Sequence, residues 1–212
     1  MNKIIIGGAI FLLAVAAGVF VWKTLPSASK PTEQGVQTPS QQIATSTYAT
    51  TTFSAVYQRD FTADDSHIYD QVNPKKPIHG VRFTIPLAMA TGTNLASDTY
   101  LSVEQLPRAK NCTGDIYLAA NVRPISLTEN GINYSLATSS GAAAGNLYEE
   151  MVYALSGSSP CTAVRYFIHS TAAANYEPGA IREFDRAALL VAFDAIRASL
   201  TLSPTPAAPV TP

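Results

Sequence analysis

The chain has 212 residues, of which 14% are charged, and its formal net charge is −1. Proteins that bind nucleic acid hold the phosphates with clustered lysines and arginines, so this composition excludes an electrostatic footprint for a nucleic-acid partner. The length predicts one folded domain with additional terminal segments.

An uncharged apolar run opens the chain. Ile4 to Trp22 contains nineteen residues without a charge, and a lysine stands on either side of it. As a helix the run is about 28 Å long, close to the roughly 30 Å hydrocarbon thickness of a bilayer. Trp22 stands where an aromatic residue of the membrane interface is expected. We therefore expect residues 1–25 to be a single-pass membrane anchor; a signal peptide cleaved near the small residues at 27–29 is the alternative.

Two further segments have compositions typical of unfolded chain. Residues 26–52 are rich in Thr, Ser, Gln and Pro, and residues 203–212 read SPTPAAPVTP. Such segments cannot bury enough apolar surface to offset their ordering entropy, so we expect a flexible stalk and a disordered tail. The folded domain is then predicted over 53–202. This domain lies C-terminal to the apolar run, and we expect it on the extracytoplasmic side of the cell membrane.

Short alternating runs predict the first strands of the domain. Each places apolar residues at every second position, as a strand with one buried face does. The three runs are Phe53 to Tyr57, Val81 to Ile85 and Tyr100 to Leu106. The later stretch from Gly114 to Asn121 is compatible with either a helical turn or a strand.

Two hairpins are predicted next. The dipeptide Asn130-Gly131 separates Ile125–Thr128 from Ile132–Leu136, and Asn-Gly between apolar runs is a strong hairpin signal. The second hairpin spans Asn146 to Ser170, where residues 161–169 alternate cleanly, and we expect it at the centre of an antiparallel sheet. A helix over Asn146 to Leu155 is the alternative, because apolar residues also recur there at every fourth position.

The last element predicted is a helix. Asp185 is a suitable N-cap for a helix from Arg186 to Ser199. Its apolar residues recur with helical spacing along one stripe, at Leu189, Phe193, Ile196 and Leu200. Arg186, Asp194 and Arg197 lie off this stripe. The sequence therefore predicts an α+β domain in which an antiparallel β-meander is packed by its C-terminal helix.

The chain has two cysteines, Cys112 and Cys161. In the oxidising compartment beyond a membrane segment such a pair usually forms a disulfide, which we predict here. Two buried free thiols in a cytoplasmic domain and a catalytic cysteine are the alternatives. Eight residues of strand, about 26 Å, separate Cys161 from His169, so these two side chains cannot form a catalytic pair.

A binding surface is predicted on the second hairpin. Tyr148, Glu150, Arg165 and His169 lie on its two strands, and tyrosines on a solvated sheet face can bind a protein or a small molecule. Ordinary packing at the sheet edge is the alternative for the tyrosines.

The sequence shows no catalytic constellation. The histidines His67, His79 and His169 lack metal-ligand spacing, and no Gly-x-Ser-x-Gly elbow is present. We therefore predict no catalytic residue, metal or cofactor, and a non-enzymatic accessory or partner-binding role. The alternative is a hydrolase that uses His169 with a serine or carboxylate from a neighbouring loop. That alternative requires a cleft that joins His169 to Ser170, Glu149 or Asp185.

The end of the chain carries a short motif. Glu183-Phe184-Asp185 precedes a helix with the pattern F-D-x-I-x-x-S at Phe193 to Ser199. In this motif and in the order of its elements, the chain from Phe83 to Leu202 resembles small bacterial extracytoplasmic proteins with a PsbP-like α/β/α fold. The resemblance implies an accessory or assembly factor without an assigned activity, and it assigns no role to any single residue.

Overall fold

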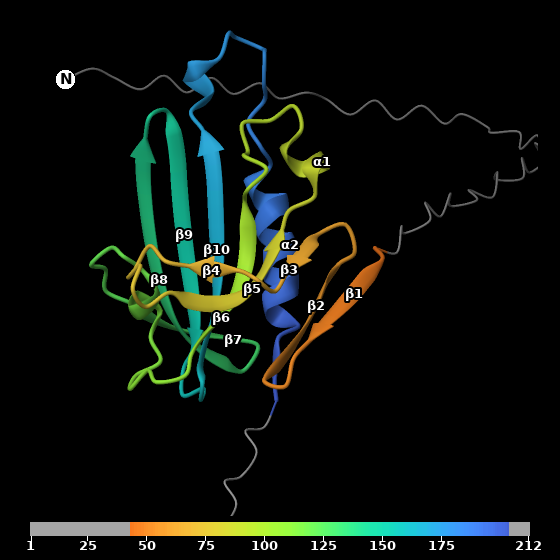
Figure 1. The fold of residues 1–212 in the computed structure, drawn as a ribbon. Helices are drawn as coiled ribbons and strands as arrows, with labels where there is room; N and C mark the ends of the chain where they lie inside the picture. The colour runs from red at the N-terminus through yellow and green to blue at the C-terminus, as the bar shows by residue number, and fades with distance from the viewer. Residues whose placement is uncertain (1–42, 204–212) are drawn as a thin grey trace, which may run out of the picture. The chain divides into compact units, whose positions relative to one another are not determined.

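The computed structural model of this protein describes residues 43–203, which form antiparallel strands and one long helix (Figure 1). The predicted anchor at Ile4 to Trp22, most of the predicted stalk and most of the predicted tail lie outside the described residues. Within 43–203, no helix has both the length and the apolar character needed to cross a membrane.

The elements follow one another in a fixed order along the chain. They are β1 (Thr45–Ala49), β2 (Phe53–Gln58), β3 (Thr62–Asp64), β4 (Ile68–Tyr69), β5 (Ile78–Thr84), α1 (Leu87–Ala90), β6 (Tyr100–Leu106), the 3₁₀ turn η1 (Gly114–Tyr117), β7 (Ile125–Glu129), β8 (Ile132–Ala143), β9 (Asn146–Leu155), β10 (Cys161–Thr171), the 3₁₀ turn η2 (Ala173–Asn175), α2 (Arg186–Ala198) and β11 (Thr201–Leu202).

The main sheet has the strand order β3-β5-β6-β10-β9-β8-β7, and β4 also pairs with β5. The predicted antiparallel sheet and the helix that packs on it are confirmed. Consecutive hairpins form a meander only over β7 to β10. The next neighbour of β10 is β6, far earlier in the chain, with Tyr166 opposite Leu101. The meander predicted for the whole sheet therefore covers only half of it.

Both predicted hairpins are present. Asn130 and Gly131 adopt the positive φ values that a two-residue turn between β7 and β8 requires. The helix alternative for Asn146 to Leu155 is wrong, because this stretch is strand β9 and pairs with both β8 and β10. Its four-residue apolar spacing also suits a strand, since four is a multiple of the two-residue strand period. Strand β8 continues to Ala143, so the turn that precedes β9 consists of Ala144 and Gly145.

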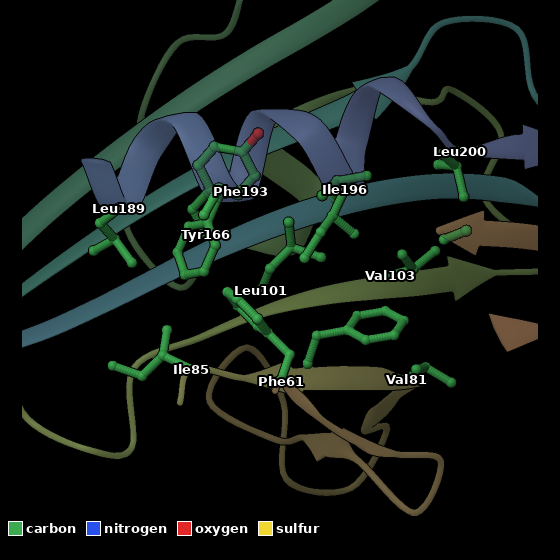
Figure 2. Packing of buried hydrophobic residues seen from close by; sticks show 14 of the residues in the cluster. Phe61, Val81, Ile85, Leu101, Val103, Tyr166, Leu189, Phe193, Ile196 and Leu200 are labelled. Atoms are coloured by element: carbon green, nitrogen blue, oxygen red, sulfur yellow. The ribbon is translucent and has the colours of Figure 1, made fainter. Parts of the chain in front are cut away.

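Helix α2 begins where the sequence predicts. The carboxylate of Asp185 accepts a hydrogen bond from the backbone N–H of Ala188 at 2.9 Å, which satisfies one of the unpaired donors at the helix start. Its apolar stripe is buried against the sheet, where Phe193 packs on Tyr166 with ring centroids 5.1 Å apart (Figure 2). The helix therefore docks through the residues that its periodicity indicates.

Arg197 departs from this pattern. It was expected to lie off the apolar stripe, yet its side chain is only 7% exposed. Its guanidinium donates to the Tyr166 hydroxyl at 2.8 Å and to Asp194 at 3.0 Å, and lies 4.2 Å from the ring centroid of Tyr153. Ion pairs and an aromatic face thus compensate for the burial of this charge.

The folded domain begins earlier than predicted. Residues 45–49 belong to the predicted stalk, but they form strand β1, which pairs with β2. Tyr48 anchors this strand, because its ring packs on Phe53 and Phe83. The Thr-rich composition of the segment suits a strand once one aromatic residue reaches the core. Strand β11 pairs with the other edge of β2 and completes a small second sheet.

The face of the main sheet opposite α2 is partly covered by loops. Residues 107–122 cross it through the η1 turn, and residues around β4 cross it beside them; Tyr69, Tyr117 and Leu118 are buried in this second core cluster. Gly114 lies against the strands so closely that a Cβ there would be 2.7 Å from the Val152 carbonyl oxygen. The undecided stretch from Gly114 to Asn121 is therefore a turn pressed onto the sheet, without strand pairing.

The disulfide prediction is confirmed. Cys112 is bonded to Cys161, with their Cα atoms 5.1 Å apart. The bond fastens the 107–122 loop to the first residue of β10, on the face away from α2. The hydroxyl of Tyr117 donates to the Cys161 carbonyl at 2.7 Å and secures the same loop a second time.

Candidate functional site

The predicted surface residues share one face of the sheet. In the register of β9 with β10, Tyr148 lies opposite His169, Glu150 opposite Phe167 and Val152 opposite Arg165. Paired residues in antiparallel strands point to the same side, so all of these side chains point away from α2. We call the half-exposed group Asn146, Tyr148, Glu150, Phe167 and His169 the open face.

The open face is built on stacked rings. The rings of Tyr148 and His169 stack with centroids 4.6 Å apart, and those of Phe167 and Tyr100 stack at 4.9 Å. Tyr148 and Phe167 are 6.2 Å apart, which joins both pairs into one row. Arg82 ends the row, with its guanidinium 5.7 Å from the Tyr100 centroid. Such contacts stabilise the row and leave ring area for a partner to cover.

His169 is held in place by both ring nitrogens. Nδ1 lies 2.7 Å from a carboxylate oxygen of Asp98, and Nε2 lies 3.0 Å from the side-chain oxygen of Asn146. Asp98 is a carboxylate from a neighbouring loop, as the hydrolase alternative requires, but the structure does not connect His169 to Ser170, Glu149 or Asp185. Ser170 follows it on the strand and points to the other face, Glu149 binds Arg186 at 2.7 Å, and Asp185 caps α2. Both ring nitrogens are thus bonded, and the imidazole of His169 is held against the ring of Tyr148.

Arg165 supports the open face from beneath and is not part of its exposed area. Its side chain is fully buried and donates two hydrogen bonds to Glu104, at 2.8 and 2.9 Å, and a third to the carbonyl of Tyr117 at 2.7 Å. It also forms an ion pair with Glu150. Its guanidinium lies 3.5 Å from the centroid of the Tyr69 ring. The predicted role of Arg165 as a surface residue is therefore corrected to a buried, supporting one.

Glu150 joins this buried cluster to the surface. Its carboxylate accepts a hydrogen bond from the Tyr69 hydroxyl at 2.9 Å and is paired with Arg165, while 18% of its side chain stays exposed. Glu149 takes the opposite face, as strand alternation requires.

The charges in the cluster have shifted proton affinities. Burial would raise the pKa of Glu104, but the attraction of Arg165 and the hydrogen bonds from Arg165 and Ser102 outweigh it and lower this pKa to about 2. Burial would lower the pKa of Arg165, but the same carboxylate raises it above its usual value. The pair is therefore ionised across the physiological range.

His67 lies at the edge of the cluster. Its side chain is 6% exposed and its Nε2 is 3.7 Å from Glu104, too far for a hydrogen bond. Its ring packs edge-on against Tyr100 with centroids 5.1 Å apart. Among residues 43–203, no group of three His, Cys, Asp or Glu side chains is arranged to hold a metal ion.

Sequence reasoning missed several members of this region, among them Phe167 and Glu104. Phe167 lies between Arg165 and His169 on the same strand face, so alternation alone pointed to it. Glu104 carried no such signal, because its contact with Arg165 depends on β6 pairing with β10. The chain matched no protein-family model, and the search of curated proteins gave no significant match.

Proposed function

We propose that this protein is a membrane-anchored extracytoplasmic accessory protein whose domain binds a partner through the open face, without catalysis. The observation that carries the proposal is the half-exposed row of Tyr148, Phe167 and His169 on a rigid sheet. Aromatic side chains of this kind provide much contact area at a low cost in conformational entropy.

Other observations support an extracytoplasmic location for the domain. A disulfide such as Cys112–Cys161 is typical of oxidising compartments. The uncharged run Ile4 to Trp22 has the length of a membrane span, and the resemblance to PsbP-like proteins agrees with an accessory role. Together these features favour an anchored domain outside the cytoplasm.

Binding through the open face can be tested by chemical crosslinking in intact cells that express the full chain. We expect the variant Tyr148→Ala with His169→Ala to lose the crosslinked partner that the wild type captures, because both rings of one stack are removed. Tyr176→Ala is the matched control, since Tyr176 is 41% exposed and lies outside the row. Equal capture by all three proteins would contradict the proposal.

The compartment can be tested with thiol reagents. The unreduced, denatured chain should offer no reactive sulfhydryl when isolated directly from cells. Two reactive sulfhydryls per chain would contradict an extracytoplasmic domain.

A further inference from the structure

Strand β8 is twice as long as its neighbour at the sheet edge. It pairs with β9 along its length, from Tyr134 to Ala143, but β7 covers its outer edge only as far as Leu136. Over residues 137–143 the described part of the chain places no strand on this outer side. The stretch reads ATSSGAA, and residues 138 and 140–143 are exposed. In Figure 1, β8 and β9 form the long hairpin at the left of the sheet.

The register fixes which backbone groups face outward. Ser156 N–H donates to the Asn133 carbonyl at 2.9 Å, so Asn133 and Ser156 are a hydrogen-bonded pair. In an antiparallel ladder such pairs alternate, so the odd-numbered residues of β8 bond to β9. The even-numbered residues Thr138, Ser140 and Ala142 therefore direct their N–H and C=O groups away from the sheet.

This edge lacks the usual protection. Exposed edge strands in soluble proteins are normally guarded by charges, prolines or bulges, since their free groups can pair with another chain. Residues 137–143 contain no charge and no proline. Six outward backbone groups on three residues are thus ready to accept one further strand.

A hollow of about 830 Å³ runs beside the same edge. On the side of α2 it is lined by the small residues of β8 and by Leu147, Met151 and Arg186, and Leu147 is 42% exposed. An added strand would project alternate side chains over Thr138, Ser140 and Ala142. Because those three are small, longer side chains on the added strand can reach Leu147 and Met151.

The geometry points to strand addition: the outer edge of β8 from Ala137 to Ala143 binds an extended, uncharged segment of a partner polypeptide. The charges that line the hollow are already paired, Arg186 with Glu149 and Glu150 with Arg165. A charged side chain facing the hollow would remain unpaired, so apolar or small residues fit there. The hollow is also lined by Tyr148 and Glu150 of the open face, but strand addition at the β8 edge requires neither the anchor nor the stacking of the rings.

A second copy of this chain fits the edge less well. It would bring Thr138, Ser140 and Ala142, which are too short to cover Leu147 and Met151. Contact over seven small residues per copy also falls short of the roughly 20–30 residues a side found in stable interfaces. We therefore assign the edge to an extended segment.

The probe for this site is a displayed library of random heptapeptides selected on the full chain, and the affinity of the selected peptides for the variant Ser140→Pro is the test. The proline removes the central outward N–H and no β8–β9 hydrogen bond, and edge strands tolerate it. Ser140→Ala is the matched control because it keeps the N–H. We expect selected peptides to bind wild type and Ser140→Ala equally and to lose at least tenfold in affinity for Ser140→Pro. The thermal midpoints of all three proteins establish that each is folded.

Amide hydrogen exchange then locates the bound peptide. The amides of Thr138, Ser140 and Ala142 should exchange at least tenfold more slowly with peptide, while those of Ser139 and Gly141, already bonded to β9, should not change. Protection elsewhere, equal binding to Ser140→Pro, or a library without enriched sequences would overturn the inference. Self-association of the wild type that Ser140→Pro abolishes would also overturn it, since a second copy would then occupy the edge.

Discussion

A fully buried arginine is rare unless its charge is compensated. Arg165 meets this condition with two carboxylates, one carbonyl and the ring of Tyr69. These contacts come from β4, β6, β9 and the 107–122 loop, so the residue fixes the positions of these four segments relative to β10. The rings of the open face lie in the next two pairs along the same strand faces, Phe167 in the first and Tyr148 with His169 in the second, and their spacing depends on this cluster.

Removal of Arg165 should therefore be costly. The variant Arg165→Met leaves Glu104 buried without its cation, and we expect the free energy of unfolding to fall by about 3–5 kcal/mol. Urea unfolding at pH 7 measures this loss. The control Arg186→Met removes an exposed arginine from its pair with Glu149 and should cost less than about 1 kcal/mol. Equal losses in the two variants would show that the cluster is not stabilising.

Glu104 should make stability depend on acid pH. Its pKa in the folded state is about 2, lower than the usual 4.5 of a glutamate, so the folded state binds this proton less tightly than the unfolded state does. Its contribution is present above about pH 4.5 and is lost as the pH falls toward 2. We expect the stability advantage of wild type over Glu104→Gln, measured by urea unfolding, to shrink across this window. An advantage that stays constant between pH 5 and pH 2.5 would contradict this prediction.

The alternation of side chains along the strands identified some residues of the site, but the burial of the others could not be predicted from the sequence. Tyr148, Glu150 and His169 could be assigned to a shared surface because the strand period fixes which side chains point the same way. The burial of Arg165 could not be predicted, since its carboxylate partner on β6 is 61 residues away in the chain. Sequence spacing does not reveal which distant strand becomes a neighbour.

At the scale of elements, strong local sequence signals predicted the secondary structure correctly. The Asn130-Gly131 turn and the helix that follows Asp185 were both predicted, because backbone conformation and capping are decided by a few adjacent residues. Strand β1 was missed because its Thr-rich sequence resembles a linker, and its stability comes from Tyr48 packing on Phe83. Amino-acid composition does not reveal tertiary contacts such as this one.

The N-cap of α2 provides a direct test at this scale. We expect Asp185→Ala to lower the free energy of unfolding by about 1 kcal/mol, because the Ala188 N–H loses its acceptor. Thermal unfolding followed by circular dichroism measures the change. Val191→Ala is the control, since Val191 is 69% exposed and should contribute little. A loss no larger than that of the control would argue against the cap.

At the scale of the whole molecule, the two faces of the main sheet are stabilised differently. One face is covered by α2 and an apolar core, and the other by loops around an ion cluster and one disulfide. The cystine links positions 49 residues apart, which in the chain-entropy account stabilises the fold by roughly 4 kcal/mol.

Reduction of the disulfide should therefore destabilise the loop-covered face of the sheet before the face covered by α2. With a reductant we expect a lower unfolding midpoint for the wild type and faster amide exchange over residues 107–122 than in α2. The variant with Cys112→Ala and Cys161→Ala is the control, because it should be destabilised already and should not respond to the reductant. A wild-type midpoint unchanged by reduction would contradict the role of the disulfide.

The pairing of β6 with β10 has a consequence for how the chain acquires its shape. Tyr100 and Phe167 meet at the middle of the sheet although they are 67 positions apart in the chain, and contacts of long separation slow folding. While the chain is synthesised from its N-terminus, β5 and β6 emerge well before the strand that will lie beside them. Until then, Leu101 lacks its neighbour Tyr166 on β10 and is open to aggregation. The nascent domain therefore needs shielding until its last fifty residues arrive.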